Sequence, residues 1–183
     1  MLEAEIIEFC SPTLAGLKTA GLFNYRFQEI DILKSEVFEE NRKLNEKGVF
    51  IELLKIQDSR ALVYVYRREW LERDLMQKEA QRLLEQIGYS RREWRDCLEQ
   101  LKERLGEYES FPHEIGLFLG YPFQDVIGFI EQKGRNYKCA GFWKVYGDET
   151  EMRKLFYRLK KCREIYGRLF SEGRTIFQLT VAA

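Results

Sequence analysis

The stretch VFIELLKIQDSRALVYVY, from Val49 to Tyr66, contains two apolar runs separated by a polar turn. Residues 49–56 and 61–66 are rich in β-branched and aromatic side chains, which fit the pleated surface of a sheet. Residues 57–60 are polar and short enough for a tight connection, so the stretch predicts a β-hairpin. Because both runs are apolar at nearly every position, we expect helices rather than water on each face of the sheet.

Helical patterns flank this hairpin on both sides. Ser11 and Pro12 are typical of an N-cap and a first helical position, and Gly48 is a typical helix end. After the hairpin, the capping box from Ser90 to Glu93 leads into an amphipathic helix. The expected helices of the first two thirds cover residues 2–9, 11–18, 31–47, 71–87 and 90–105.

The last third alternates between helices and strands. We expect a helix over 123–132, a strand over 140–146, a helix over 148–171 and a strand over 175–181. Together these elements predict an α+β fold, in which a small mixed sheet of three to four strands is covered by helices. The length of 183 residues and the lack of a long linker lead us to interpret residues 1–183 as a single domain.

Composition predicts a cytoplasmic, non-membrane protein with reduced thiols. No apolar run approaches the roughly 18 residues of a spanning helix, and the first five residues include two acids, Glu3 and Glu5, where a secretory signal is basic. The four cysteines have no Cys-x-x-Cys spacing, which argues against a disulfide framework or a zinc site.

Charge is distributed unevenly along the chain. The net charge is zero, yet residues 133–174 contain 12 Lys/Arg against 5 Asp/Glu, a net of +7. Such a segment suits a small anionic ligand, an acidic protein surface or a solvated helix face. The overall pI of about 6.7 is well below that of a typical nucleic-acid-binding domain, so we expect no nucleic-acid partner.

His113 is the only histidine of the chain. A metal site built on two histidines is therefore excluded, and we expect no metal. Imidazole titrates near neutrality, so His113 could act as a general acid or base with Glu114 or a cysteine. The alternative is a structural residue at the entry of a short helix.

Cys10 and Cys139 are the cysteines that could carry chemistry. Cys10 precedes the expected helix start at Ser11, where the helix dipole would stabilise a thiolate. Cys139 follows Lys138 and begins an expected strand. Free cysteines are more often buried and inert. That second interpretation fits Cys97 and Cys162, which lie in phase with apolar helical stripes.

A loop of glycine, cations and an aromatic residue precedes Cys139. Its composition can hold an anion or stack on a flat ring, and we assign ligand binding to Arg135, Asn136, Lys138 and Lys144. Walker, Gly-x-Gly-x-x-Gly and Gly-x-Ser-x-Gly motifs are absent from the sequence, so neither a cofactor nor an enzyme class can be identified.

Two stretches, CSPTLAGLK from Cys10 and FPHEIGLFLGYP from Phe111, carry a family resemblance, which continues through Gly134 and CAGFWKVY from Cys139. The chain resembles an uncharacterised family of domain-of-unknown-function proteins of anaerobic Gram-positive bacteria. Genes of that family often lie near those of flavodoxin-like proteins. The resemblance therefore implies a redox setting and an acidic partner such as a flavodoxin, and it carries over no activity.

Two hypotheses follow. In the first, the protein binds a small molecule or cofactor, with thiol chemistry at a catalytic site of Cys10, His113 and Cys139. Its chain segments 10–13, 111–120 and 133–139 would then converge in space. In the second, the protein catalyses nothing and docks an acidic redox protein through a basic helix. The cations of that helix are Lys154, Arg158, Lys161 and Arg168.

Overall fold

The computed structural model describes residues 1–90, 93–107 and 111–182. Backbone contacts divide the chain into two compact units. Unit 1 consists of Met1–Trp70 and Lys161–Ala183, and unit 2 consists of Leu71–Lys160. Two compact units can belong to one domain, so the single-domain interpretation stays a prediction.

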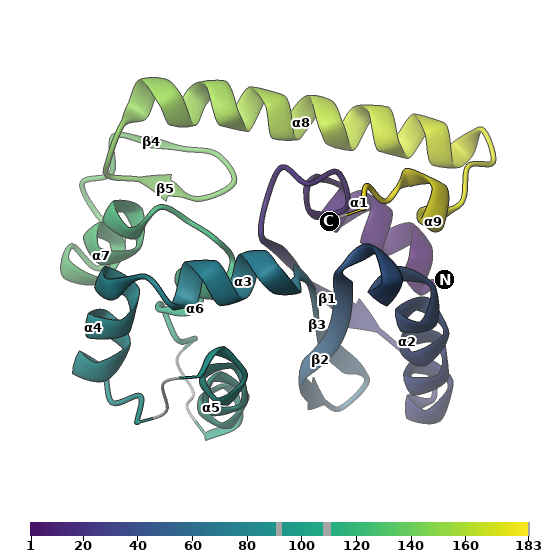
Figure 1. Ribbon diagram of the computed structural model, residues 1–183, viewed down its shortest axis with the longest axis horizontal. Helices are drawn as coiled ribbons and strands as arrows, with labels where there is room; N and C mark the ends of the chain where they lie inside the picture. The colour runs from purple at the N-terminus through teal and green to yellow at the C-terminus, as the bar shows by residue number, and fades with distance from the viewer. Residues whose placement is uncertain (91–92, 108–110, 183) are drawn as a thin grey trace. The chain divides into compact units, whose positions relative to one another are not determined.

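Helices and small antiparallel sheets alternate along the chain, which confirms the α+β class (Figure 1). The elements of unit 1 are α1 (Leu2–Leu14), β1 (Ala20–Arg26), α2 (Ile30–Leu44), η1 (Asn45–Lys47), β2 (Val49–Gln57), β3 (Arg60–Arg67) and α9 (Ile176–Leu179). Those of unit 2 are α4 (Lys78–Gln86), α5 (Trp94–Glu107), α6 (Ile115–Phe118), α7 (Phe123–Glu131), β4 (Cys139–Ala140) and β5 (Lys144–Val145). Helices α3 (Arg68–Leu75) and α8 (Glu149–Ser171) contain residues of both units.

The predicted hairpin is the centre of unit 1. Strands β2 and β3 pair antiparallel around a tight turn at Asp58, whose φ of 54° is left-handed. Strand β1 pairs antiparallel with the other edge of β3, giving the order β1-β3-β2. The described strand pairs are all antiparallel, so the expectation of a mixed sheet is wrong. Strand β1 was not predicted from the sequence.

Strand β3 is buried on both faces, as its continuous apolar run predicts. On one face Ala61, Val63 and Val65 join a core that α1 and α2 complete, and both helices lie against the sheet (Figure 1). On the other face Tyr64 is fully buried and its ring stacks 5.0 Å from that of Tyr66. The hairpin therefore provides core on two sides.

The predicted break between two helices at Ser11 is wrong, because α1 runs without interruption from Leu2 to Leu14. Pro12 lies inside its last turn and cannot donate to the Glu8 carbonyl. That carbonyl instead accepts from Arg163 Nε at 2.7 Å. A side chain from α8 thus replaces the hydrogen bond that proline removes, and the helix continues.

Arg67, at the end of β3, is a buried cation bonded entirely to backbone. It is 2 % exposed, and its guanidinium donates to the carbonyls of Thr13, Leu14 and Val181, each at 2.7 Å. The first two are terminal carbonyls of α1, where a positive charge also meets the negative end of the helix dipole. Burial lowers the pKa of Arg67. This one side chain ties the sheet, α1 and the C-terminal segment together.

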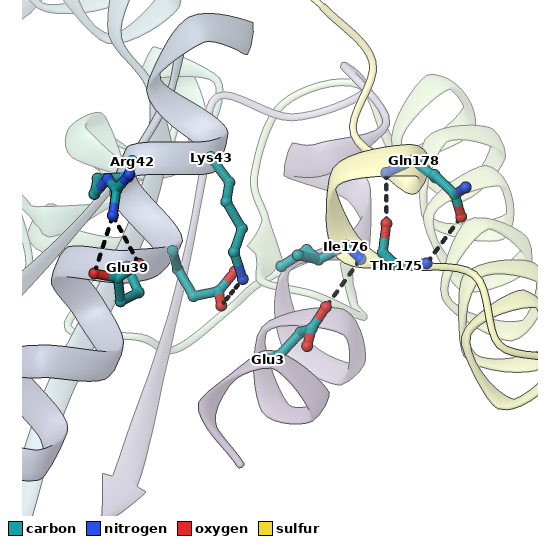
Figure 2. Close-up of polar contacts among 8 residues, drawn as sticks. Glu3, Glu39, Arg42, Lys43, Thr175, Ile176 and Gln178 are labelled. Carbon is teal, nitrogen blue, oxygen red and sulfur yellow. Dashed lines mark hydrogen bonds and ion pairs between the residues drawn. The ribbon is translucent and has the colours of Figure 1, made fainter.

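The strand expected over 175–181 is wrong, because the segment forms the single-turn helix α9. Thr175 and Gln178 make a reciprocal capping box, and Glu3 of α1 accepts from the backbone N–H of Ile176 at 3.0 Å (Figure 2). Lys47 donates to the carbonyls of Phe177 and Thr180. Local capping and these anchors override the β propensity of the sequence.

In unit 2 the predicted helices largely form. The pattern over 71–87 divides into α3 and α4, whereas α5 and α7 lie where expected. The capping box proposed from Ser90 to Glu93 includes residues 91 and 92, which lie outside the described residues. Asp148 accepts from the backbone N–H of Glu151 at 3.0 Å and caps α8 as predicted. No helix in the described part of the chain is long and apolar enough to cross a membrane.

Candidate anion-binding surface

The small hairpin of β4 and β5 in unit 2 is held by one buried carboxylate. Asp125, on α7, is 2 % exposed. It accepts hydrogen bonds from Trp143 Nε1 at 2.8 Å and from the backbone N–H groups of Tyr146 and Gly147 at 2.7 and 2.8 Å. A buried carboxylate with three donors is well satisfied. Asp125 therefore fixes the position of the hairpin on α7.

Aromatic packing and two glycines complete this support. Trp143 stacks on Tyr121 with ring centroids 4.5 Å apart and meets the ring of Phe156 edge-on at 4.6 Å. A Cβ at Gly141 would lie 2.3 Å from the Phe156 ring, and one at Gly128 would lie 2.5 Å from the Tyr146 ring. No side chain fits at either position, so the hairpin approaches its neighbours through glycine.

The loop before β4 is fastened to β5 by lysines. Lys144 Nζ donates to the carbonyl of Gly134 at 2.9 Å, and the backbone N–H of Lys138 donates to Val145 at 2.8 Å. Lys138 Nζ also donates to the carbonyl of Gly147 at 2.6 Å. These bonds bring the predicted ligand-binding residues of the loop and of β5 onto one hairpin.

Lys144 and His113 meet at a single aromatic ring. The Nζ atom of Lys144 lies 5.7 Å from the ring centroid of Phe129 and 4.9 Å from that of Tyr137. The imidazole of His113 lies 5.0 Å from the same Phe129 ring, tilted by 60°. The structure therefore brings His113 and the loop over 133–138 together. They belong to two of the three chain segments that were expected to converge.

Four cations of this region are not paired with acids. We call Lys133, Arg135, Lys138 and Lys144 the hairpin cations. None makes an ion pair with a residue that the structure describes, and residues 133–147 contain no Asp or Glu. Arg135, Asn136 and Lys138 are exposed, as is His113. The surface is therefore positively charged and open to a partner.

The cations expected to dock a partner from α8 are placed differently. Lys154 pairs with Glu151 at 2.7 Å, and Lys161 pairs with Glu164 at 2.9 Å. Arg168 lies 3.9 Å from Glu172, and Arg158 is exposed without an ion pair to a described residue. Three of these four cations thus have an acid one turn away on their own segment.

Cys139 and Cys10 lie in different units. Cys139 belongs to β4 opposite Val145 and is 6 % exposed. Cys10 is fully buried inside α1 of unit 1, with no helix start beside it, so the argument for a dipole-stabilised thiolate is wrong. Burial raises the pKa of Cys10 to about 12, although Lys18 and Arg163 oppose the shift. A catalytic site that joins Cys10 to His113 and Cys139 stays a prediction.

All four cysteines are buried and none is in a disulfide. Burial raises the pKa of Cys97 and of Cys162 to about 11. Both lie on helices with their thiols in the protein interior, which agrees with the core role predicted for them. Among the described residues, no group of three His, Cys, Asp or Glu could hold a metal ion.

Asp125, Phe129 and Tyr146 were not predicted from the sequence as residues of this surface. Asp125 follows Pro122 by three residues, a pattern that indicates a helix N-terminus and says nothing about the acceptor role. Phe129 falls on an apolar helical stripe. The one signal in the sequence was Gly128, a glycine inside a helical pattern, which can mark a close approach of another chain segment.

These features define a class: an α+β protein with a basic, aromatic hairpin surface and buried thiols. A family model described as "Protein of unknown function (DUF3793)" matches residues 6–180. The chain therefore belongs to this uncharacterised family. No curated protein and no solved structure matches it significantly.

Proposed function

We propose that this protein is a non-catalytic interaction module that binds an acidic partner protein through the hairpin cations. One observation carries the proposal: the four cations have no acid among residues 133–147 and no ion pair to a described residue. Unpaired like charges repel one another, so binding to a surface that neutralises them is electrostatically favourable.

The exposed side chains favour a protein partner. Tyr137 is 43 % exposed, and it lies between Arg135 and Lys138 in the sequence. Tyrosine and arginine are enriched at protein interfaces, since they combine contact area with directed hydrogen bonds. A partner surface rich in Asp and Glu would complement this charge, and an acidic redox protein such as a flavodoxin has that chemistry.

Thiol chemistry has less support as a function. The four thiols are buried, and burial raises the pKa of three of them. A buried thiol with a raised pKa is mostly protonated at neutral pH and is a poor nucleophile. Small-molecule binding without thiol chemistry would use the same cations and is an alternative for the occupant.

The test compares two pairs of charge-neutralising substitutions that remove the same charge. Lys133→Gln with Arg135→Gln removes two hairpin cations, and Arg153→Gln with Lys154→Gln removes two that are paired within α8. Binding to a flavodoxin and to a polyglutamate peptide is measured by biolayer interferometry at low and high salt.

We expect the hairpin pair to weaken binding about fivefold at low salt, with a smaller difference at high salt. The helix pair should weaken it less than about twofold, because each cation removed was already compensated by a glutamate. Equal losses for the two pairs would indicate a general effect of net charge. Binding that neither pair changes would refute the proposal.

A further inference from the structure

The two edges of the sheet in unit 1 are not equivalent. The outer edge of β2 is closed, because Asn41 of α2 donates to the carbonyl of Ile51 at 2.9 Å and accepts from its N–H at 2.8 Å. A register shift between Leu53 and Lys55 then interrupts the strand. Covering an edge and bulging it are two ways in which proteins keep an edge strand from pairing with another chain.

The outer edge of β1 has no such cover over most of its length. At its two ends, the carbonyl of Thr19 accepts from β3 and the N–H of Phe27 donates to the turn before β3. Bonding direction alternates along an antiparallel strand, so the odd-numbered residues of β1 are the ones that bond β3. The N–H and C=O groups of Leu22, Asn24 and Arg26 therefore point away from the sheet, and no described residue bonds them.

Exposure agrees with an open edge. Asn24 and Arg26 are exposed, and Leu22 is half-buried. Strand β1 has neither a proline nor a register shift, the features that protect many edge strands. Towards its start the edge is occupied, because Lys18 Nζ donates to the carbonyl of Ala20. The open stretch therefore runs from Leu22 to Arg26.

A second copy of β1 fits this open stretch in one register. Two copies related by a twofold axis present the same residues to each other, and their strands pair antiparallel. With the axis at Asn24, that residue faces its own copy. Leu22 of each chain then faces Arg26 of the other. All the open N–H and C=O groups are paired in this arrangement.

Charge and occupied acceptors disfavour the neighbouring registers. With the axis nearer the start of β1, the pairing needs the carbonyl of Ala20, which already accepts from Lys18. With the axis nearer the end, the pairing runs past the end of the strand or places Arg26 beside its copy. Arg26 already faces Arg60 across the sheet, and like charges on adjacent strands are destabilising.

The aromatic side chains support the same register. With the axis at Asn24, Phe23 of each chain faces Tyr25 of the other at a position where side chains of paired strands are closest, and aromatic pairs there are favourable. Phe9 of α1 stacks on Phe23 with ring centroids 5.4 Å apart and is 40 % exposed. An aromatic ring thus remains open next to this pair.

We infer that this protein forms a twofold dimer in which β1 pairs antiparallel with β1 of a second copy, centred on Asn24. The pairing joins two three-stranded sheets into one. Because the β2 edge is closed, the assembly stops at two chains and does not grow into a filament. The inference concerns unit 1 and does not depend on the proposed function.

Cysteine cross-linking tests the register. Asn24→Cys places a thiol opposite its copy with the Cα atoms about 5.5 Å apart, which is within disulfide range. Arg26→Cys is the matched control at the same edge, and its Cα atoms would be about 14 Å apart. The native cysteines are all buried. Under mild oxidation we expect Asn24→Cys to form a covalent dimer at least about tenfold faster than Arg26→Cys.

Sedimentation equilibrium tests the dimer itself, and we expect the wild type to dimerise. Asn24→Pro removes the N–H at the centre of the pairing and should raise the dimer dissociation constant about tenfold or more. Asn24→Thr keeps that N–H and should leave the constant within about twofold. Since the N–H is not used inside the chain, the melting temperature of Asn24→Pro in dilute solution should stay close to that of the wild type.

Three outcomes overturn the inference. The first is a wild-type protein that stays monomeric. The second is a dimer that Asn24→Pro leaves intact, because that dimer would form through another surface. The third is equal cross-linking of Asn24→Cys and Arg26→Cys, which refutes the register even where Asn24→Pro does not fold.

Discussion

Arg67 of unit 1 and the hairpin cations of unit 2 are positive charges used in opposite ways. Arg67 is buried, and three of its N–H groups are occupied by backbone carbonyls. Of the hairpin cations, Lys138 and Lys144 each bind one carbonyl, and Lys133 and Arg135 bind none among the described residues. A cation whose donors are taken up by backbone stabilises the fold, whereas one with donors to spare is available to a partner.

Arg67→Met should have the largest effect on the unfolding free energy. A small effect would contradict the comparison between buried and available cations. The substitution removes the donors of three carbonyls near the end of α1 and the C-terminal segment, which costs about 3 kcal/mol or more of unfolding free energy. Lys133→Met, at an exposed hairpin cation, should change it by less than about 0.5 kcal/mol. Urea unfolding followed by circular dichroism measures both, and similar losses would contradict the distinction.

Asp125→Asn sharpens the comparison, because this acid holds the hairpin on which the unpaired cations lie. Asparagine presents one acceptor oxygen and an NH₂ group, so it cannot receive Trp143 Nε1 and the two backbone N–H groups together. We expect a loss of about 2 kcal/mol in the stability of unit 2. Tryptophan fluorescence during urea unfolding reports it, with Asp31→Asn on the exposed start of α2 as the control. Equal stability of the two variants would argue against the role of Asp125.

The smallest expected effect is the pH dependence of stability that the buried thiol of Cys10 causes. Its pKa is about 12 in the folded protein against 9.0 for a free thiol, so above pH 9 the unfolded chain loses this proton and the folded chain keeps it. The contribution of this thiol to stability should therefore fall as pH rises from 9 towards 12, by about 1.4 kcal/mol at pH 10.

Cys10→Ala isolates that contribution. Burial lowers the pKa of Lys18 to about 8, so Lys18 acts with the opposite sign and raises stability with pH above 8. The useful quantity is therefore the difference between wild type and Cys10→Ala at pH 8 and at pH 10. If the stability of wild type relative to Cys10→Ala is the same at pH 10 as at pH 8, the raised pKa of this thiol is contradicted.

The central hairpin was predictable because its signal is local: a run of β-branched and aromatic residues on each side of a polar turn. Helices α2, α5 and α7 follow from apolar spacing in the same way. Pro12 and α9 show where local signals fail. The missing hydrogen bond at Pro12 is replaced by Arg163, a residue far away in the sequence, and Glu3 helps to hold α9.

The candidate surface was partly predictable from composition. Glycine, cations and tyrosine in a loop before Cys139 indicated anion binding, and the hairpin places Lys144 beside that loop. Phe129 and Tyr146 could not be found in this way, because their importance depends on tertiary contacts with Lys144 and Gly128. The predicted thiolate at Cys10 depended on a helix start that α1 does not have.

The division of unit 1 into two stretches of sequence has a consequence for synthesis on the ribosome. Residues 1–70 contain the sheet and α1, but the acceptors for Lys47 and one acceptor of Arg67 lie in residues 177–181. All of unit 2 must be translated in between. At ordinary elongation rates this takes about 5 to 20 seconds. During that time the part of the core of unit 1 that residues 161–183 cover stays exposed in the nascent chain.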